Sequence, residues 1–178
     1  MTRTFISIDI PKKIQGEIQK IQGELPKFYG KLTESENLHL TLKFLGEIND
    51  EKIEETRKRL RGIKYNCFET EVGAPGFFDN VKEGKKYGPV WLYLSNCEGL
   101  QKKVAKSLDD LFPIEKRFMS HLTIARVKDV GDKRSFLREL SNLKTPKINF
   151  VVDSFRLKKS VLYTKGLKYE DIEKYNLI

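Results

Sequence analysis

Two short stretches of the chain, HLTL at 39–42 and HLTI at 121–124, repeat one alternating pattern. An aliphatic residue at every second position predicts a strand with one buried face. Successive side chains of a strand point to opposite sides, so the histidine and the threonine of each stretch should share the other face. The 178-residue chain has only two histidines, and both stand at this position. The fold must therefore accommodate two strands that each present one imidazole and one hydroxyl group.

The order of elements around the two stretches repeats as well. Alternating apolar runs predict strands, and apolar residues at helical spacing behind a proline or an acidic cap predict helices. Each half of the chain reads strand, helix, H-x-T strand, helix and further strands. In chain order the expected elements are a strand at 4–10, a helix from Pro11, a strand at 37–46, a helix from Asn49 or Asp50, strands at 67–74 and 89–95, a helix at 98–112, a strand at 120–127, a helix from Asp132, and strands at 147–160 and 160–165.

This repetition predicts the class of fold. We expect an α+β protein with two lobes related by a pseudo-twofold axis, each a mostly antiparallel sheet flanked by helices, with a central cleft between them. The whole chain, 1–178, should form a single bilobal domain with sequence-level halves of about 1–78 and 89–178.

Charge and cysteine content limit the expected binding partners, the metal or disulfide sites and the localisation of the protein. The chain carries 34 Lys+Arg against 25 Asp+Glu, a net charge of +9, which favours a polyanion such as nucleic acid or an acidic membrane surface. A solvated Lys/Glu-rich surface accounts for the same count equally well. Cys67 and Cys97 form no C-x-x-C motif, so neither a zinc site nor a disulfide framework is indicated. The first apolar run is too short for a signal peptide, and about 18 apolar residues never run together, so we expect a soluble, cytoplasmic protein without membrane contact.

The paired histidines and threonines suit the chemistry of phosphate esters. If the lobes face each other, His39 and His121 can exchange protons near neutral pH, one as a base and one as an acid. The hydroxyls of Thr41 and Thr123 can hold the oxygens on which charge grows. Two histidines and two threonines are a poor ligand set for a catalytic metal, so no metal and no cofactor is expected. A lone histidine on a strand is more often structural, but two copies in matched contexts favour catalysis.

The two H-x-T motifs resemble the paired motifs of the 2H phosphoesterase superfamily. Their extended forms, NLHLTLKFLGE at 37–47 and SHLTIARV at 120–127, are similar to the branch of RNA 2′,3′-cyclic phosphodiesterases, also named 2′-5′ RNA ligases. The segments RTFISIDIP at 3–11 and RLKKSVLYTKGLKYE at 156–170 resemble that branch too. The resemblance therefore extends over nearly the whole chain.

The resemblance implies hydrolysis of a 2′,3′-cyclic phosphate at an RNA end to a 2′-phosphomonoester, with the 3′ oxygen leaving. It implies that His39 is the general acid and His121 the general base, although the residues alone do not order the two. It also implies a reversible 2′-5′ ligation that needs no nucleotide cofactor. The implied partner is RNA with cyclic phosphate ends, for example tRNA fragments, and the protein is expected to act as a monomer.

Two basic residues near the motifs are further candidates. Arg126 resembles an arginine of this branch that holds phosphate, but strict alternation puts it on the face of Leu122, so it needs a bulge or a curled side chain to reach the cleft. Alternation puts Lys43 on the face of His39, where it is a candidate RNA contact, and a lysine that simply reaches solvent is an equal alternative.

Other functions remain open from the sequence. A 2H enzyme can act on a small cyclic nucleotide or trim RNA 3′ ends. The charge of +9 also fits a non-catalytic protein whose cleft only binds an RNA end.

Overall fold

The structure is a computed structural model, and it describes residues 1–79, 88–115, 117–164 and 166–178. These residues form nine strands, four α-helices and one short 3-10 helix. In chain order the elements are β1 (Thr2–Asp9), α1 (Lys12–Gly23), β2 (Tyr29–Leu32), η1 (Ser35–Asn37), β3 (His39–Ile48), α2 (Asp50–Arg61), β4 (Phe68–Phe77), β5 (Pro89–Leu94), α3 (Glu98–Ser107), β6 (His121–Asp129), α4 (Lys133–Asn142), β7 (Asn149–Val152), β8 (Ser154–Tyr163) and β9 (Gly166–Asn176). The expected elements occur in the expected order, with three differences. β2 and β9 were not expected, the strand expected at 147–160 is divided into β7 and β8, and α3 ends at Ser107 rather than at residue 112.

The strands join into one curled antiparallel sheet with the order β7-β4-β5-β6-β3-β1-β8-β9, and β2 pairs with β6 as well. The two H-x-T strands, β3 and β6, lie side by side at its centre. They are antiparallel and pair at a single position, Leu40 with Leu122, close to the first residue of each strand. From that contact they run in opposite directions, which is the arrangement expected of a pseudo-twofold axis.

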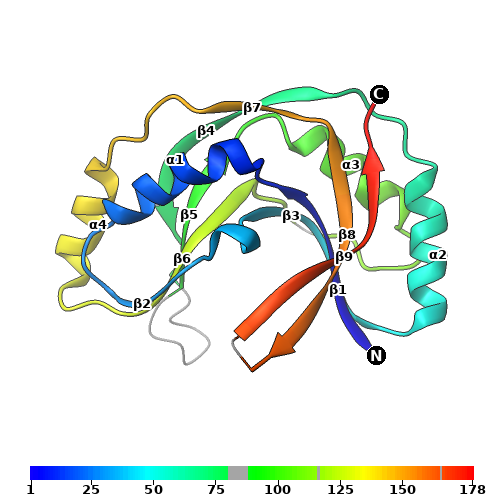
Figure 1. The fold of residues 1–178 in the computed structure, drawn as a ribbon, viewed down its shortest axis with the longest axis horizontal. Coiled ribbons are helices and arrows are strands. Elements are labelled where there is room, and N and C mark those ends of the chain that lie inside the picture. Colours follow the sequence, from blue (N-terminus) through cyan, green and yellow to red (C-terminus); the bar gives the residue numbers. More distant parts are fainter. Residues whose placement is uncertain (80–87, 116, 165) are drawn as a thin grey trace.

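Each lobe takes strands from both halves of the sequence. β4 comes from the first half but pairs with β5 and β7, whereas β8 and β9 come from the second half and extend the sheet beyond β1. Figure 1 shows α1 and α4 beside one part of the sheet and α2 and α3 beside the other. Most of the connection between the two sequence-level halves, residues 80–87, lies outside the described residues. The sequence-level halves are therefore not the spatial lobes.

The apolar residues of the H-x-T strands form the centre of the core. Leu40, Leu42, Leu122 and Ile124 are almost completely buried beneath the sheet. The helix that follows each H-x-T strand begins at the cap expected from the sequence. The Asn49 side chain accepts a hydrogen bond from the backbone N–H of Lys52, which begins α2.

The corresponding cap of α4 is Asp132, whose carboxylate accepts from the backbone N–H groups of Arg134 and Ser135. The buried aliphatic residues thus fix the face of each H-x-T strand on which its histidine and threonine lie. Within the described ranges, no helix has the length and apolar character that crossing a membrane requires.

Candidate active site

The meeting of β3 and β6 brings both His-Thr pairs to one hollow. This hollow has a volume of about 600 Å³, and His39, Thr41, His121 and Thr123 all line it. Because Leu40 and Leu122 pair on the core side, the residues that flank them project together on the other side. The antiparallel contact therefore places two imidazoles and two hydroxyls around one space.

Both imidazole rings are held in the same way. Nδ1 of His39 lies 2.7 Å from the carbonyl oxygen of Asn37, and Nδ1 of His121 lies 2.7 Å from that of Met119. A carbonyl oxygen can only accept, so Nδ1–H must donate in both rings. Nε2 of each histidine is thereby left to take or give a proton.

Aromatic rings surround each imidazole. The ring of His39 lies 5.0 Å from the rings of Phe5 and Tyr169, and the ring of His121 lies 5.1 Å from that of Phe78, measured between centroids. Tyr169 reaches the site because the β8–β9 hairpin bends back toward η1, where the Asn37 amide donates to the carbonyl of Leu167 over 3.2 Å. The sequence does not distinguish Phe5 from the aromatic residues of the core, and Tyr169 was not predicted, because the contacts of both rings with His39 depend on tertiary pairing.

Burial lowers the pKa of His39 to about 4. The value of about 4 is the net result of several effects. The carbonyl acceptor on Asn37 and the charge of Asp9 oppose the effect of burial, whereas the cations of Lys158 and Arg126 add to it. Without a bound anion, His39 is therefore neutral at pH 7.

A bulge in β6 brings Arg126 to the hollow. Trp91 of β5 pairs with Thr123, but the next residue back, Val90, pairs with Ala125, so β6 carries one extra residue at Ile124. Ile124 and Ala125 are both buried, and the alternation then resumes in the opposite phase. Arg126 consequently lines the hollow beside the two histidines.

The same irregularity in β3 turns Lys43 away from the hollow. Ser7 pairs with Thr41 but Ile6 pairs with Lys43, and Lys43 is only 2% exposed. Its ammonium donates to the carbonyl of Pro113 and pairs with the Glu115 carboxylate, each over 2.8 Å. The expectation that Lys43 lies on the face of His39 is wrong, because strict alternation ignores the extra residue.

Phe44 occupies the place that Lys43 was expected to take. Its side chain is 66% exposed and lines the hollow. Phe44 stands five residues after His39, as Arg126 stands five residues after His121, and the burial pattern of the two strands is the same up to this point. The equal spacing of H-x-T-x-x-F and H-x-T-x-x-R was visible in the sequence and could have identified Phe44.

The rest of the hollow extends along β1, β2 and the β8–β9 hairpin, lined among others by Arg3, Lys31 and Ser160. Its described part thus has arginine and lysine side chains for a polyanion and an exposed aromatic ring for a base. Over the ranges that the structure describes, no three His, Cys, Asp or Glu side chains gather where they could hold a metal ion.

Comparison with known proteins places the chain among phosphoesterases. The sequence model of the family described as LigT like Phosphoesterase matches residues 8–91 and 95–169, and each matched range contains one H-x-T strand. A protein named RNA 2′,3′-cyclic phosphodiesterase from Methanocaldococcus jannaschii is 32% identical over 177 residues, 97% of this chain and 99% of the relative. A protein of the same name from Thermotoga maritima is 33% identical over 178 residues, 94% of this chain and 91% of the relative.

Solved structures share the fold. Crystalline LigT of Escherichia coli, complexed with 3′-AMP, superposes with a TM-score of 0.79 at 21% identity, covering 99% of this chain and 98% of that chain. The protein TT0787 of Thermus thermophilus gives a TM-score of 0.78 at 22% identity, covering 98% of this chain and 97% of that chain. The expected α+β fold with antiparallel strands flanked by helices is confirmed, although the strands form one curled sheet rather than a separate sheet in each lobe.

The buried Lys43 should matter for stability. Lys43→Met keeps the length of the side chain but removes the partner of Glu115 and of the Pro113 carbonyl, so the free energy of unfolding should fall by about 2 kcal/mol. Urea denaturation measures this change. Lys102→Met on the exposed surface of α3 is the control and should change stability by less than about 0.5 kcal/mol. Equal effects of the two substitutions would contradict the assignment of Lys43 as a structural residue.

Proposed function

This chain belongs to the LigT-like phosphoesterase family, and from that premise we propose that it opens 2′,3′-cyclic phosphates at RNA ends to leave 2′-phosphomonoesters. Relatives more than 30% identical over nearly the full chain carry the name RNA 2′,3′-cyclic phosphodiesterase, which supports this choice of substrate. The net charge of +9 supports a polyanionic partner such as RNA, tRNA fragments with cyclic ends included.

One observation carries the proposal. His39 and His121 line one hollow, and in each ring Nδ1 is bound to a backbone carbonyl so that Nε2 is left for proton transfer. A general acid and a general base placed together serve a displacement in which one oxygen attacks and another leaves. Thr41, Thr123 and Arg126 supply donors for the phosphate oxygens between them.

In the proposed hydrolysis, Nε2 of His121 takes a proton from water, and the water oxygen attacks phosphorus. The bond between phosphorus and O3′ breaks, and Nε2 of His39 gives its proton to O3′. The two threonine hydroxyls and the Arg126 guanidinium hold the non-bridging oxygens, where they stabilise the charge that develops. The chain's own residues complete this cycle without a metal ion or a cofactor.

The acid role requires that substrate binding change His39. Burial keeps the pKa of His39 at about 4 in the free protein, so Nε2 carries no proton at neutral pH. A cyclic phosphate is an anion, and an anion beside an imidazole favours the charged form. The substrate itself therefore prepares His39 for proton transfer.

The reverse reaction uses the same groups. If the 5′-hydroxyl of a second RNA replaces water, His121 can take its proton and the product is a 2′-5′ linkage. Water is present at a far higher concentration than RNA ends, so we expect hydrolysis to dominate.

Both histidines should be essential for ring opening. A short RNA with a 2′,3′-cyclic phosphate end, incubated with the protein in excess chelator, should give an RNA of the same length with a 2′-monoester. His39→Ala and His121→Ala should each lower kcat by about 10²- to 10⁴-fold, because each removes one proton transfer.

Product analysis separates the alternatives. Release of mononucleotides would mean trimming of the RNA, opening of cyclic mononucleotides alone would mean a small-molecule enzyme, and salt-dependent binding without turnover would mean an RNA-end-binding protein. Full activity of either alanine variant would contradict the paired-histidine mechanism.

The pH dependence should report both histidines. The reactive form has His39 charged and His121 neutral, so activity should fall when pH rises through the pKa of the acid and when it falls through the pKa of the base. The pKa of His39 is about 4 in the free protein and should rise in the complex. The profile of kcat should therefore lie at higher pH than that of kcat/KM, by roughly one pH unit or more. Flat profiles between about pH 5 and 8 would contradict this mechanism.

Arg126 and Phe44 should separate chemistry from binding. Arg126→Gln removes the charge that holds phosphate and should lower kcat by about 10²-fold.

Phe44→Ala removes an exposed ring on which the terminal base can stack, so KM should rise about tenfold while kcat changes little. Phe44→Tyr is the control and should keep KM near that of the natural protein. A fall in kcat without a change in KM for Phe44→Ala would refute the stacking role.

A further inference from the structure

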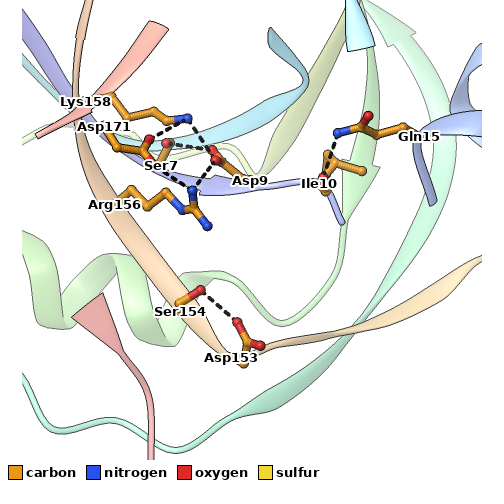
Figure 2. A network of polar contacts seen from close by, with 9 residues as sticks. All are labelled: Ser7, Asp9, Ile10, Gln15, Asp153, Ser154, Arg156, Lys158 and Asp171. Atoms are coloured by element: carbon orange, nitrogen blue, oxygen red, sulfur yellow. Dashed lines mark hydrogen bonds and ion pairs between the residues drawn. The ribbon is translucent and has the colours of Figure 1, made fainter. Parts of the chain in front are cut away.

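Four charged side chains form a closed cluster beside His39. They come from three neighbouring strands, Asp9 from β1, Arg156 and Lys158 from β8, and Asp171 from β9 (Figure 2). The Lys158 ammonium lies 2.8 Å from the Asp9 carboxylate and 3.0 Å from that of Asp171. The Arg156 guanidinium lies 3.3 Å from Asp9 and 2.5 Å from Asp171. Each cation therefore binds both carboxylates.

The cluster holds Asp9 in one place. Lys158 is only 5% exposed, and Ser7, which is completely buried, donates its hydroxyl to the Asp9 carboxylate over 3.5 Å. A carboxylate held by these partners keeps a fixed orientation. The net charge of the cluster is zero. At short range, however, each charge still acts strongly on a neighbouring titratable group.

Asp9 lies next to His39. The two residues are direct partners in the antiparallel pairing of β1 and β3. Side chains of directly opposed residues emerge on the same face with their Cβ atoms roughly 5 Å apart. The fixed carboxylate of Asp9 therefore lies beside the imidazole that is proposed to protonate O3′.

The surroundings of His39 contain charges of both signs. Asp9 on β1 favours the protonated ring, and its charge raises the pKa of His39. Lys158 on β8 and Arg126 on β6 act in the opposite direction. Tyr169 on β9 and Phe5 on β1 contact the ring with their aromatic faces or edges and bring no formal charge. Among the described groups that act on His39, Asp9 supplies the negative charge.

The corresponding position beside His121 carries no carboxylate. His121 pairs directly with Tyr93 of β5, whose hydroxyl donates to Glu98 over 3.1 Å. The pseudo-twofold thus relates Asp9 to a tyrosine. This difference distinguishes two histidines that are otherwise held alike, each by a carbonyl two residues earlier.

We propose that Asp9, fixed by Lys158 and Arg156, is a positioning residue whose negative charge lets His39 carry the proton that it gives to the leaving oxygen. The inference rests on the proposed function, because it concerns the acid of that reaction.

Two substitutions that remove charges of opposite sign test the inference. Asp9→Asn removes the negative charge and should lower the pKa of His39 by roughly one pH unit, whereas Lys158→Met removes a positive charge and should raise it. NMR titration of the histidine ring protons measures the pKa directly. The chain has only two histidines, so His39→Gln and His121→Gln assign both signals. A cluster with a merely structural role would give no shift, or shifts of the same direction in both variants, and either result would overturn the inference.

Asp171→Asn is the matched control. Asp171 binds the same two cations as Asp9, but it is not the register partner of His39. The substitution should lower stability about as much as Asp9→Asn and shift the pKa of His39 much less. Equal shifts in the two variants would contradict a specific role for Asp9. If Asp9→Asn does not fold, the upward shift in Lys158→Met remains as an independent test.

Kinetics provide a second readout. Above the pH optimum, kcat of Asp9→Asn should fall about tenfold and should recover when the pH is lowered by about one unit, because a lower pKa leaves less protonated His39 at a given pH. Asp9→Glu should retain most of the activity. A loss that lower pH does not recover would refute the charge role. Histidine shifts of the expected signs without ring opening would refute the proposed function and leave only the effect of Asp9 on the pKa of His39.

Discussion

The site depends on a single antiparallel contact between two strands. Leu40 and Leu122 pair at the centre of the sheet, and both side chains are buried in the core. Because side chains alternate between the two faces of a strand, the burial of these leucines places the histidine and threonine of each strand on the opposite, concave side. The strands separate beyond this contact, and β2 takes the adjacent edge of β6. A hollow with two His-Thr pairs follows from burying two leucines in this register.

One extra residue in each H-x-T strand decides which side chain follows the threonine into the hollow. In β6 the bulge at Ile124 and Ala125 brings Arg126 to the site. In β3 the corresponding shift buries Lys43 and exposes Phe44. The buried lysine then ties β3 to the segment that leads into β6, through Pro113 and Glu115. The same irregularity thus supplies a cation in one half-site, an aromatic ring in the other, and a buried contact between β3 and the segment that follows α3.

The two half-sites share a frame but differ in their surroundings. Each imidazole donates Nδ1–H to a carbonyl two residues earlier, so the backbone hydrogen bonds do not distinguish the two histidines. Asp9 beside His39 and Tyr93 beside His121 break that equality, as do Phe44 and Arg126. These differences give the two histidines different electrostatic surroundings, which the acid and base roles of the proposed reaction can use. The exchange of β4 and β8–β9 between lobes brings the charged cluster to only one of them.

The sequence by itself determined most of the strands, the four helices, the caps of α2 and α4, the α+β class and the placing of each histidine with its threonine on one face; β2 and β9 were not predicted. These features depend on the alternation of apolar residues and on local capping, which act over a few residues. Only the tertiary structure decided which strands are neighbours, where the bulges of β3 and β6 fall, and hence that Lys43 is buried while Phe44 and Arg126 line the hollow. It alone placed Asp9, Lys158 and Tyr169 around His39, because Asp9 reaches His39 only through the pairing of β1 with β3, and Lys158 and Tyr169 lie more than 100 residues from His39 in the sequence.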